Sequence, residues 1–161
     1  MNQIRPSDSY DLRQKLKRVE SIVNIDLGFV VSNDDETVAS EKTAYLFLRD
    51  RRVLGMATAE IIKRAFVLNK SLSGDRSNKS QKAMVGIHKI WVHCKSRKQG
   101  VASMLVDTIR SKFIYGFMVP VQMLAFSSPT QAGADFANQY CNSDDDSKGG
   151  GGGGVLVYDC V

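Results

Sequence analysis

The fold is decided by one stretch of the chain, Gly86-Ile-His-Lys-Ile-Trp-Val-His-Cys-Lys-Ser-Arg-Lys-Gln-Gly-Val-Ala-Ser103. Its first part, up to Val92, is rich in β-branched and aromatic residues, which predicts a buried strand. From Val101 apolar residues recur at helical spacing, so a helix is expected to begin after Gly100. The first N–H groups of such a helix have no partner within it and, with the helix dipole, attract anions. The stretch therefore predicts a phosphate cradle.

Within this stretch, the segment Arg97-Lys-Gln-Gly-Val-Ala102 is similar to R/Q-x-x-G-x-G/A, the pyrophosphate-binding signature of the GNAT acetyltransferase superfamily. It lacks the Gly-Lys-Ser/Thr ending of a P-loop. Gly100 has no Cβ, so a ligand can approach the backbone of the turn closely. Arg97 and Lys98 add positive charge. On the motif alone, an ordinary strand-to-helix turn remains the alternative.

Length and composition restrict the class of protein. The chain has 161 residues, of which 43% are hydrophobic, so one domain with a real core is expected over residues 1–161. No apolar run reaches membrane-spanning length, and residues 1–10 are too polar for a secretory signal. The cysteines Cys94, Cys141 and Cys160 form no C-x-x-C pair, which favours neither a disulfide framework nor a zinc knuckle. A non-secreted protein in a reducing compartment is expected.

The net charge of +5 is concentrated in three basic clusters, at residues 13–18, 49–52 and 95–98. Basic clusters can hold nucleic acid, but single-stranded binders also need aromatic side chains on which bases stack. No aromatic residues interleave with these clusters. Direct nucleic-acid binding is therefore disfavoured.

Two segments lack apolar periodicity and are expected to be flexible loops. Residues 69–81 are rich in Ser, Lys and Gly, and residues 142–154 combine an acidic tract with the run Gly149–Gly154. The glycine run is compatible with an engineered loop or with a low-complexity insertion.

The other elements alternate helix and strand, which predicts a mixed α/β fold with helices packed against one mixed sheet. The first half has an amphipathic helix over Asp11–Leu27 and a β-hairpin of Thr43–Leu48 and Val53–Ile62 that continues to about Val67. The apolar stripe of that helix consists of Leu12, Leu16, Val19, Ile22 and Val23. The second half has the central strand, a helix ending near Gly116, a strand over Val121–Phe126, a helix capped by hydroxyls of Ser127-Ser-Pro-Thr130 and running to about Tyr140, and a strand over Val155–Tyr158.

Several motifs together resemble the acetyltransferase domain of the cohesin acetyltransferases, the Eco/ESCO family. They are Val53-Leu-Gly-Met-Ala-Thr-Ala-Glu60, Gly86-Ile-x-x-Ile-Trp-Val92, the cradle, Arg110-Ser-x-Phe-Ile-Tyr-Gly116, Ala125-Phe-Ser-x-Pro-Thr130, Phe136-Ala-x-Gln-Tyr-Cys141 and Val155-Leu-Val-Tyr158. The resemblance implies the GNAT acyltransferase fold, a central mixed sheet flanked by helices. It also implies a nuclear, chromatin-associated enzyme that establishes sister-chromatid cohesion. Such an enzyme transfers acetyl from acetyl-CoA to lysines on the head of the SMC cohesin subunit. Replication or cohesin-associated factors are further expected partners, and membrane association is not expected.

The chain departs from the family at three points. The family usually carries a zinc finger ahead of this domain, whereas the only histidines here are His88 and His93, so the finger is expected to be absent and no metal is expected. The family commonly has an acidic residue in its Phe-Ser-x-Pro-Thr segment, where this chain has Ser128. His88 stands where relatives have a small polar residue.

Three residues are candidates for proton transfer. Asp107 lies on the cradle helix, where the family usually has Glu, and could accept the substrate proton or attract the lysine. The alternative is a surface carboxylate paired with Arg110 or Ser103. His88 offers an imidazole suited to deprotonation, with a structural histidine as the alternative. Ser128 is no general base at neutral pH without help.

The resemblance also assigns acetyl-CoA contacts. The strand before the cradle holds the thioester and pantetheine through its backbone, and the same side chains are expected to pack the sheet. Phe136 either lines the coenzyme arm or fills the core. The full set of expected coenzyme contacts is Ile90, Trp91, Val92, Arg97, Lys98, Gln99, Gly100, Val101, Ala102, Ser103, Thr130 and Phe136.

Two other functions remain open. The cradle alone would also permit a GNAT acetyltransferase for another amine, such as a protein N-terminus or a small amine. The serine at position 128 in place of an acid would also permit a catalytically impaired binding module.

Overall fold

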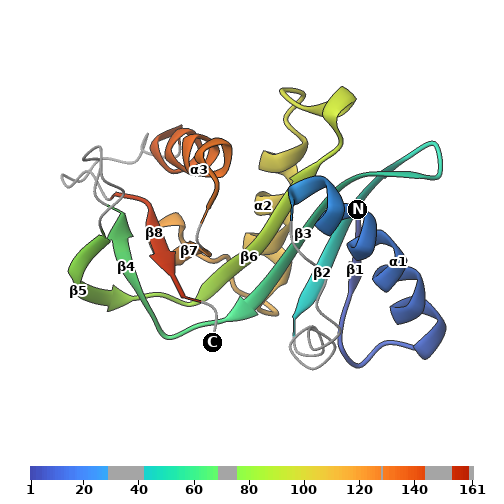
Figure 1. Cartoon of the computed structure of the whole chain (residues 1–161). Helices are drawn as coiled ribbons and strands as arrows, with labels where there is room; N and C mark the ends of the chain where they lie inside the picture. The colour runs from blue at the N-terminus through green and yellow to red at the C-terminus, as the bar shows by residue number, and fades with distance from the viewer. Residues whose placement is uncertain (29–41, 69–75, 128, 144–153, 160–161) are drawn as a thin grey trace. The chain divides into compact units, whose positions relative to one another are not determined.

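The computed structural model describes residues 1–28, 42–68, 76–127, 129–143 and 154–159 (Figure 1). These residues form two compact units, and each is described by itself. Unit 1 comprises Met1–Glu60 and Lys89–Ile109, and unit 2 comprises Ile61–His88 and Arg110–Val161. The eight strands belong to one mixed sheet, which confirms the expected mixed α/β class. The assignment of the chain to a single domain stays a prediction.

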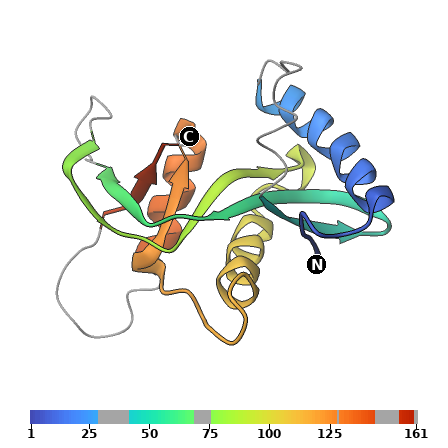
Figure 2. The same cartoon turned by 90° about the horizontal axis from the view of Figure 1, so that it is seen from below.

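Unit 1 contains four strands in the order β1-β2-β3-β6 and two helices. Its elements are β1 (Asn2–Ile4), α1 (Tyr10–Leu27), β2 (Thr43–Arg49), β3 (Arg52–Ile61), the second half of β6 (Val85–Val92) and most of α2 (Val101–Lys112). The helix α1 lies on one face of these strands and α2 on the opposite face (Figure 2).

The core of unit 1 lies between α1 and the sheet. Its buried members are Ile4, Val23, Ala44, Leu46, Met56 and Trp91. Leu16, Val19 and Leu27 of α1 pack against them, so the apolar stripe of this helix docks as its periodicity predicts. Leu12 and Ile22, which belong to the same predicted stripe, remain exposed. Three or four turns of contact therefore suffice to hold α1.

Unit 2 contains the strand order β6-β7-β8-β4-β5. Its elements are β4 (Arg64–Leu68), β5 (Arg76–Lys82), the first half of β6, a 3₁₀ turn at Val121–Met123, β7 (Leu124–Ser127), α3 (Gln131–Ser143) and β8 (Leu156–Tyr158). The pairs β6–β7 and β7–β8 are parallel, whereas β4 pairs antiparallel with both β8 and β5. Gly86 is required by packing here, because an added Cβ would lie 2.5 Å from Cζ of the Tyr158 ring.

Several sequence-based boundaries are wrong. The strand expected over Val121–Phe126 begins only at Leu124, because Val121–Met123 form a 3₁₀ turn in which Met123 N–H bonds to Pro120 O. Residues 76–81, expected to be part of a flexible loop, belong to β5, where Arg64 pairs with Lys82 and Phe66 with Ser80. Backbone groups pair whatever the side chains are, and edge strands are often polar and lysine-rich, so apolar periodicity could not reveal this strand. Residues 69–75 lie outside the described part of the chain.

The other two wrong boundaries concern element ends. The second hairpin strand does not continue unbroken to Val67 but divides into β3 and β4, because Ile62 N–H bonds to Met84 O and Ala83 N–H to Lys63 O at the break. The helix α2 ends at Lys112 rather than near Gly116, which instead adopts φ of +71° in the turn that follows. Of the expected loop 142–154, Asn142 and Ser143 end α3, and residues 144–153 lie outside the described ranges.

Among the helices that the structure describes, none is long and apolar enough to cross a membrane.

Candidate active site

The cradle turn, residues 97–100, leads from the sheet into α2. Lys98 has φ of +60° and Gly100 φ of +77°, a region that favours glycine. The first bond within the helix runs from Met104 N–H to Gly100 O at 3.0 Å. The amides of Val101, Ala102 and Ser103 precede that bond, so they have no acceptor inside the helix. The turn therefore presents N–H groups in the way that the sequence predicts.

The charges along α2 also favour an anion at its start. The first turn of α2 contains no acidic residue, and the last turn contains Arg110 and Lys112. Cations at the C-terminal end complement the helix dipole, whereas at the N-terminal end no carboxylate compensates it. Lys98 and Gln99 are exposed beside the free amides, and an added Cβ on Gly100 would meet no atom within 4 Å. The start of α2 is open to a ligand.

A glycine in β3 lets α2 lie close to the sheet. A Cβ on Gly55 would lie 2.7 Å from Cγ1 of Val101 and 3.1 Å from Cδ1 of Leu105. Val101 and Leu105 are both buried, and the β-branched Val101 side chain has little freedom to move away. Gly55 thus sets the distance between the sheet and the first turn of α2.

The end of β6 is joined to the cradle by short-range hydrogen bonds. His93 N–H donates to Leu54 O at 2.9 Å, which continues the contact between β6 and β3. A 3₁₀ turn, Cys94–Ser96, follows. Arg97 Nε donates to Val92 O at 3.1 Å, and Gln99 Nε2 donates to Lys95 O at 2.9 Å. The cradle turn is therefore tied back onto the strand that precedes it.

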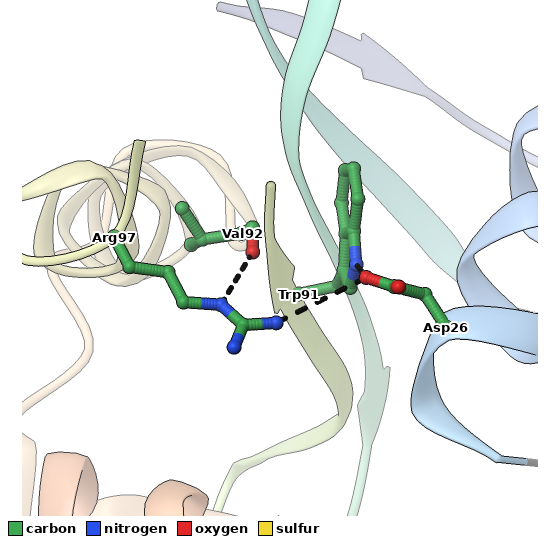
Figure 3. Close-up of polar contacts among 4 residues, drawn as sticks. All are labelled: Asp26, Trp91, Val92 and Arg97. Carbon is green, nitrogen blue, oxygen red and sulfur yellow. Dashed lines mark hydrogen bonds and ion pairs between the residues drawn. The ribbon is translucent and has the colours of Figure 1, made fainter. Parts of the chain in front are cut away.

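An aspartate that the sequence analysis did not select joins this site to α1 (Figure 3). Trp91 is only 7% exposed, and its Nε1–H donates to Asp26 Oδ2 at 2.6 Å. The same Oδ2 lies 3.9 Å from Nη2 of Arg97. Asp26 thus contacts both the strand β6 and the cradle turn.

One signal in the sequence does mark Asp26. It lies in the last turn of α1, which contains no basic residue. A carboxylate at that end of a helix opposes the dipole by about 0.3–1 kcal/mol at a surface site. A residue placed against this preference suggests a partner from elsewhere in the chain, and here the partners are Trp91 and Arg97.

The C-terminal end of α1 makes a second contact with β6, two residues before Trp91. Lys89 Nζ donates to Asn24 Oδ1 at 2.9 Å. Lys89 and Trp91 are two residues apart and so project from one face of β6. Burial raises the pKa of the Glu20 carboxyl, an effect partly offset by Lys89 and two other lysines. The last turns of α1 therefore face β6 with polar as well as apolar groups.

The structure places most of the expected coenzyme contacts in unit 1. The residues Ile90 to Val92 and Arg97 to Ser103 are consecutive along β6, the cradle turn and the start of α2. The side chain of Trp91 packs in the core on the α1 side, so of its two expected roles packing is confirmed. Only its backbone remains available to a coenzyme.

The catalytic candidates are dispersed. Asp107 is exposed on α2 in unit 1, whereas His88 is half-buried on β6 in unit 2. Ser128 lies outside the described residues. Asp107 and His88 therefore belong to different units, and the catalytic roles of all three residues stay predictions.

Thr130 and Phe136 belong to unit 2. Thr130 Oγ1 accepts from Gly133 N–H at 3.3 Å and its carbonyl from Ala134 N–H at 2.8 Å, so Thr130 caps α3 as predicted. Phe136 stacks at a tilt against Tyr140, with ring centroids 5.8 Å apart. Tyr140 Oη accepts from Arg110 Nη1 at 3.0 Å. Both residues therefore have structural roles, and their contacts with a coenzyme stay predictions.

The described part of the chain contains no group of three or more His, Cys, Asp or Glu side chains that could hold a metal ion.

Comparison with known proteins identifies relatives of this arrangement. The family model described as ESCO1/2 acetyl-transferase matches residues 81–148, which include β6, the cradle and α3. N-acetyltransferase ESCO2 of Mus musculus is 34% identical over 87% of this chain, and N-acetyltransferase eso1 of Schizosaccharomyces pombe is 35% identical over 77%. The chain spans only 25% and 15% of the lengths of those two proteins.

A solved structure is similar over nearly the whole chain. The xEco2 acetyltransferase domain, determined with a bound lysine–CoA conjugate, superposes with a TM-score of 0.84 and 31% sequence identity. The match covers 99% of this chain and 92% of that domain. With its glycine turn between β6 and α2 on a mixed sheet, this chain belongs to the Eco/ESCO family of GNAT-type acetyltransferases.

Proposed function

We propose that this chain is a protein-lysine N-acetyltransferase that transfers acetyl from acetyl-CoA to lysines on the head of the SMC cohesin subunit. The observation that carries the proposal is the open start of α2, where the amides of Val101 to Ser103 have no acceptor in the helix. The xEco2 domain, which is similar over 92% of its length, was solved with a CoA conjugate. The names of the relatives as N-acetyltransferases support the same reaction.

The coenzyme would bind by its pyrophosphate at the cradle turn. Two negative phosphates meet the free amides, the positive end of the α2 dipole and the cations Arg97 and Lys98. Gly100 leaves the space above the turn open. Acetyl-CoA is thus the cosubstrate for which the charge and shape of this turn are suited.

Catalysis would rest mainly on positioning. The neutral amine of the substrate lysine attacks the thioester carbonyl carbon, the carbon–sulfur bond breaks, the thiolate of CoA leaves and the amine loses a proton. Holding the two reactants in line supplies a large part of the rate enhancement in such reactions. The main chain of Ile90 to Val92, directly before the cradle, is the proposed support for the thioester end of the coenzyme.

The proton acceptor is proposed to be Asp107 or His88. Asp107 is on the helix that begins at the cradle, where an exposed carboxylate could take the proton directly or through water. His88 offers an imidazole, which can accept a proton in its neutral form. Ser128 is proposed at most to orient a water.

The protein substrate and the nuclear location are proposals based on family membership. The known relatives are much longer than this chain, and a role in sister-chromatid cohesion is proposed here for the protein that carries this domain. Cohesin-associated or replication factors are proposed as further partners on the same basis.

An acetylation assay tests the proposal. The protein is incubated with acetyl-CoA and an SMC head domain, and modified positions are located by mass spectrometry. Acetylation of head lysines that depends on Gly100 is the expected result. If a peptide with a free N-terminus and no lysine, or a small amine, is acetylated as fast, the enzyme acts on another amine. If CoA binds but no amine is acetylated, the chain is a binding module.

A further inference from the structure

The guanidinium of Arg97 contacts two groups of the protein. Its Nε is fixed by Val92 O at 3.1 Å, and Nη2 faces Asp26 Oδ2 at 3.9 Å (Figure 3). Two of the three guanidinium nitrogens are therefore directed at groups of the protein. The side chain is still 58% exposed, so it remains accessible to a ligand at the cradle turn.

The two contacts differ in strength. The bond to Val92 O has the length of an ordinary hydrogen bond, so it orients the guanidinium. The approach to Asp26 is too long for a hydrogen bond and joins two half-exposed groups, an arrangement worth about 0–1 kcal/mol. Val92 thus sets the direction of Arg97, and Asp26 acts on it as a nearby negative charge.

Asp26 itself stays in place when Arg97 moves. Its Oδ2 accepts from Trp91 Nε1 at 2.6 Å, a short bond of the charge-assisted kind, and Trp91 is buried in the core beneath α1. A carboxylate held in this way does not follow the guanidinium. An anion at the cradle therefore competes with a fixed carboxylate for the same cation.

We propose that Asp26 is the counter-ion of Arg97 and that the coenzyme pyrophosphate displaces it, so that Asp26 lowers the affinity of the cradle for CoA and acetyl-CoA. This inference rests on the proposed coenzyme site. Because the product CoA carries the same pyrophosphate as acetyl-CoA, Asp26 also shortens the time for which product occupies the enzyme. Asp26 is a positioning residue here, since it acts on the ligand through Arg97.

A double-mutant cycle tests the proposal, with CoA as the probe in calorimetric titrations. Asp26→Asn keeps an oxygen that can accept from Trp91 but removes the charge that faces Arg97. We expect CoA to bind roughly threefold to fivefold more tightly at low ionic strength, which is the upper range for an exposed ion pair. The gain shrinks at about 0.5 M salt, where exposed charges are screened.

The second arm of the cycle uses Arg97→Ala. In that background the substitution Asp26→Asn is expected to leave CoA affinity unchanged, because the cation through which Asp26 acts is absent. An equal gain in both backgrounds, or weaker CoA binding by Asp26→Asn, overturns the proposal. Asp11→Asn is the matched control, since it removes the same charge from the same helix about 22 Å away along its axis.

The single tryptophan of the chain provides a spectroscopic readout. Trp91 bonds to the carboxylate that faces Arg97, so CoA binding is expected to change its emission in the wild-type protein and to change it less in Asp26→Asn. If Asp26 had only a structural role, Asp26→Asn would lower the melting temperature but would not alter the change in Trp91 emission on CoA binding. An emission response that is the same in both proteins counts against the proposal.

The outcomes separate this inference from the proposed function. If the wild-type protein binds CoA and Gly100→Asp does not, the cradle is confirmed as the coenzyme site. The double-mutant cycle then tests the role of Asp26 alone. If the wild-type protein does not bind CoA, both proposals fail. Should Asp26→Asn not fold, Trp91→Phe keeps the packing but leaves Asp26 to Arg97 alone, and CoA is then expected to bind more weakly. Unchanged or tighter binding by that variant overturns the proposal.

Discussion

Two basic turns in unit 1 look alike in backbone conformation but differ in what they can bind. The hairpin turn, Asp50–Arg51, has φ of +50° and +61°, and the cradle turn contains Lys98 at +60° and Gly100 at +77°. The hairpin turn joins β2 to β3, and Arg49 pairs with Arg52 directly beside it. Its neighbouring backbone groups are thereby committed to the sheet ladder.

The cradle turn ends instead in a helix whose first amides have no acceptor within it. The cations differ in the same way, since Arg49 lies over the Phe47 ring at 5.8 Å, whereas Arg97 is held beside the start of α2 by Val92 O. Positive charge and left-handed backbone are thus common to both turns. The comparison teaches that the two turns differ in their backbone amides rather than in charge, and helix-start amides are the feature that the proposed anion site requires.

The largest effect is expected from Gly100→Asp. It places a carboxylate where the phosphates approach, so CoA binding should fall by about 100-fold or more, as measured by calorimetry. Gly100→Asn is the matched control, because Asn is also tolerated at positive φ but adds no charge. If a folded Gly100→Asp variant binds CoA as the wild type does, the cradle turn is no more an anion site than the hairpin turn.

The second prediction concerns α2, the helix that follows the cradle turn and has no counterpart after the hairpin turn. If Asp107 is the proton acceptor, Asp107→Asn should lower turnover roughly 100-fold while CoA affinity stays the same. If His88 is the acceptor, His88→Ala should show the larger loss, and the wild-type rate should titrate with an imidazole-like midpoint. Near-normal turnover by both variants at several pH values would mean that neither side chain is the base.

The third prediction concerns the contact that positions the cradle. Gly55→Ala introduces a Cβ 2.7 Å from Cγ1 of Val101, so the start of α2 must shift. Overpacking of this kind typically destabilises a protein by about 1–3 kcal/mol, measurable by urea denaturation. CoA affinity should fall as well, since the amides move. Val53→Thr, at a half-buried position of the same strand, exchanges side chains of nearly equal size and is therefore a comparison without overpacking. An unaltered stability of Gly55→Ala would show that α2 adapts without strain.

The smallest effect on CoA affinity is expected when one cation is removed from either turn. Lys98→Gln should weaken CoA binding by a factor of about three to ten, and this loss should diminish at high salt. Arg51→Gln removes a charge from the hairpin turn at a similar φ and should leave CoA affinity unchanged. Equal losses from the two substitutions would indicate that general positive charge, rather than the cradle, attracts the coenzyme.

Patterns within short segments predicted much of this fold. The period change at Gly100, the docking of α1 by the middle of its apolar stripe and the hydroxyl cap at Thr130 are all local, and the structure confirms each of them, although Leu12 and Ile22 of that stripe are exposed. The strand β5 was missed because its polar side chains carry no periodic signal, although its backbone pairs with β4. Local patterns report which face of an element is apolar, and an edge strand need not have such a face.

The strand, glycine turn and helix start, and with them the resemblance to the family, could be predicted from the sequence alone, because they depend on residues that are neighbours along the chain. Only the tertiary structure decided which distant groups meet them. Asp26 lies far from Trp91 and Arg97 in sequence, and Gly55 far from Val101, yet one pair of contacts sets the charge beside the cradle and the other sets its distance from the sheet. Such contacts depend on how α1 and α2 pack on opposite faces of the strands, which no local pattern encodes.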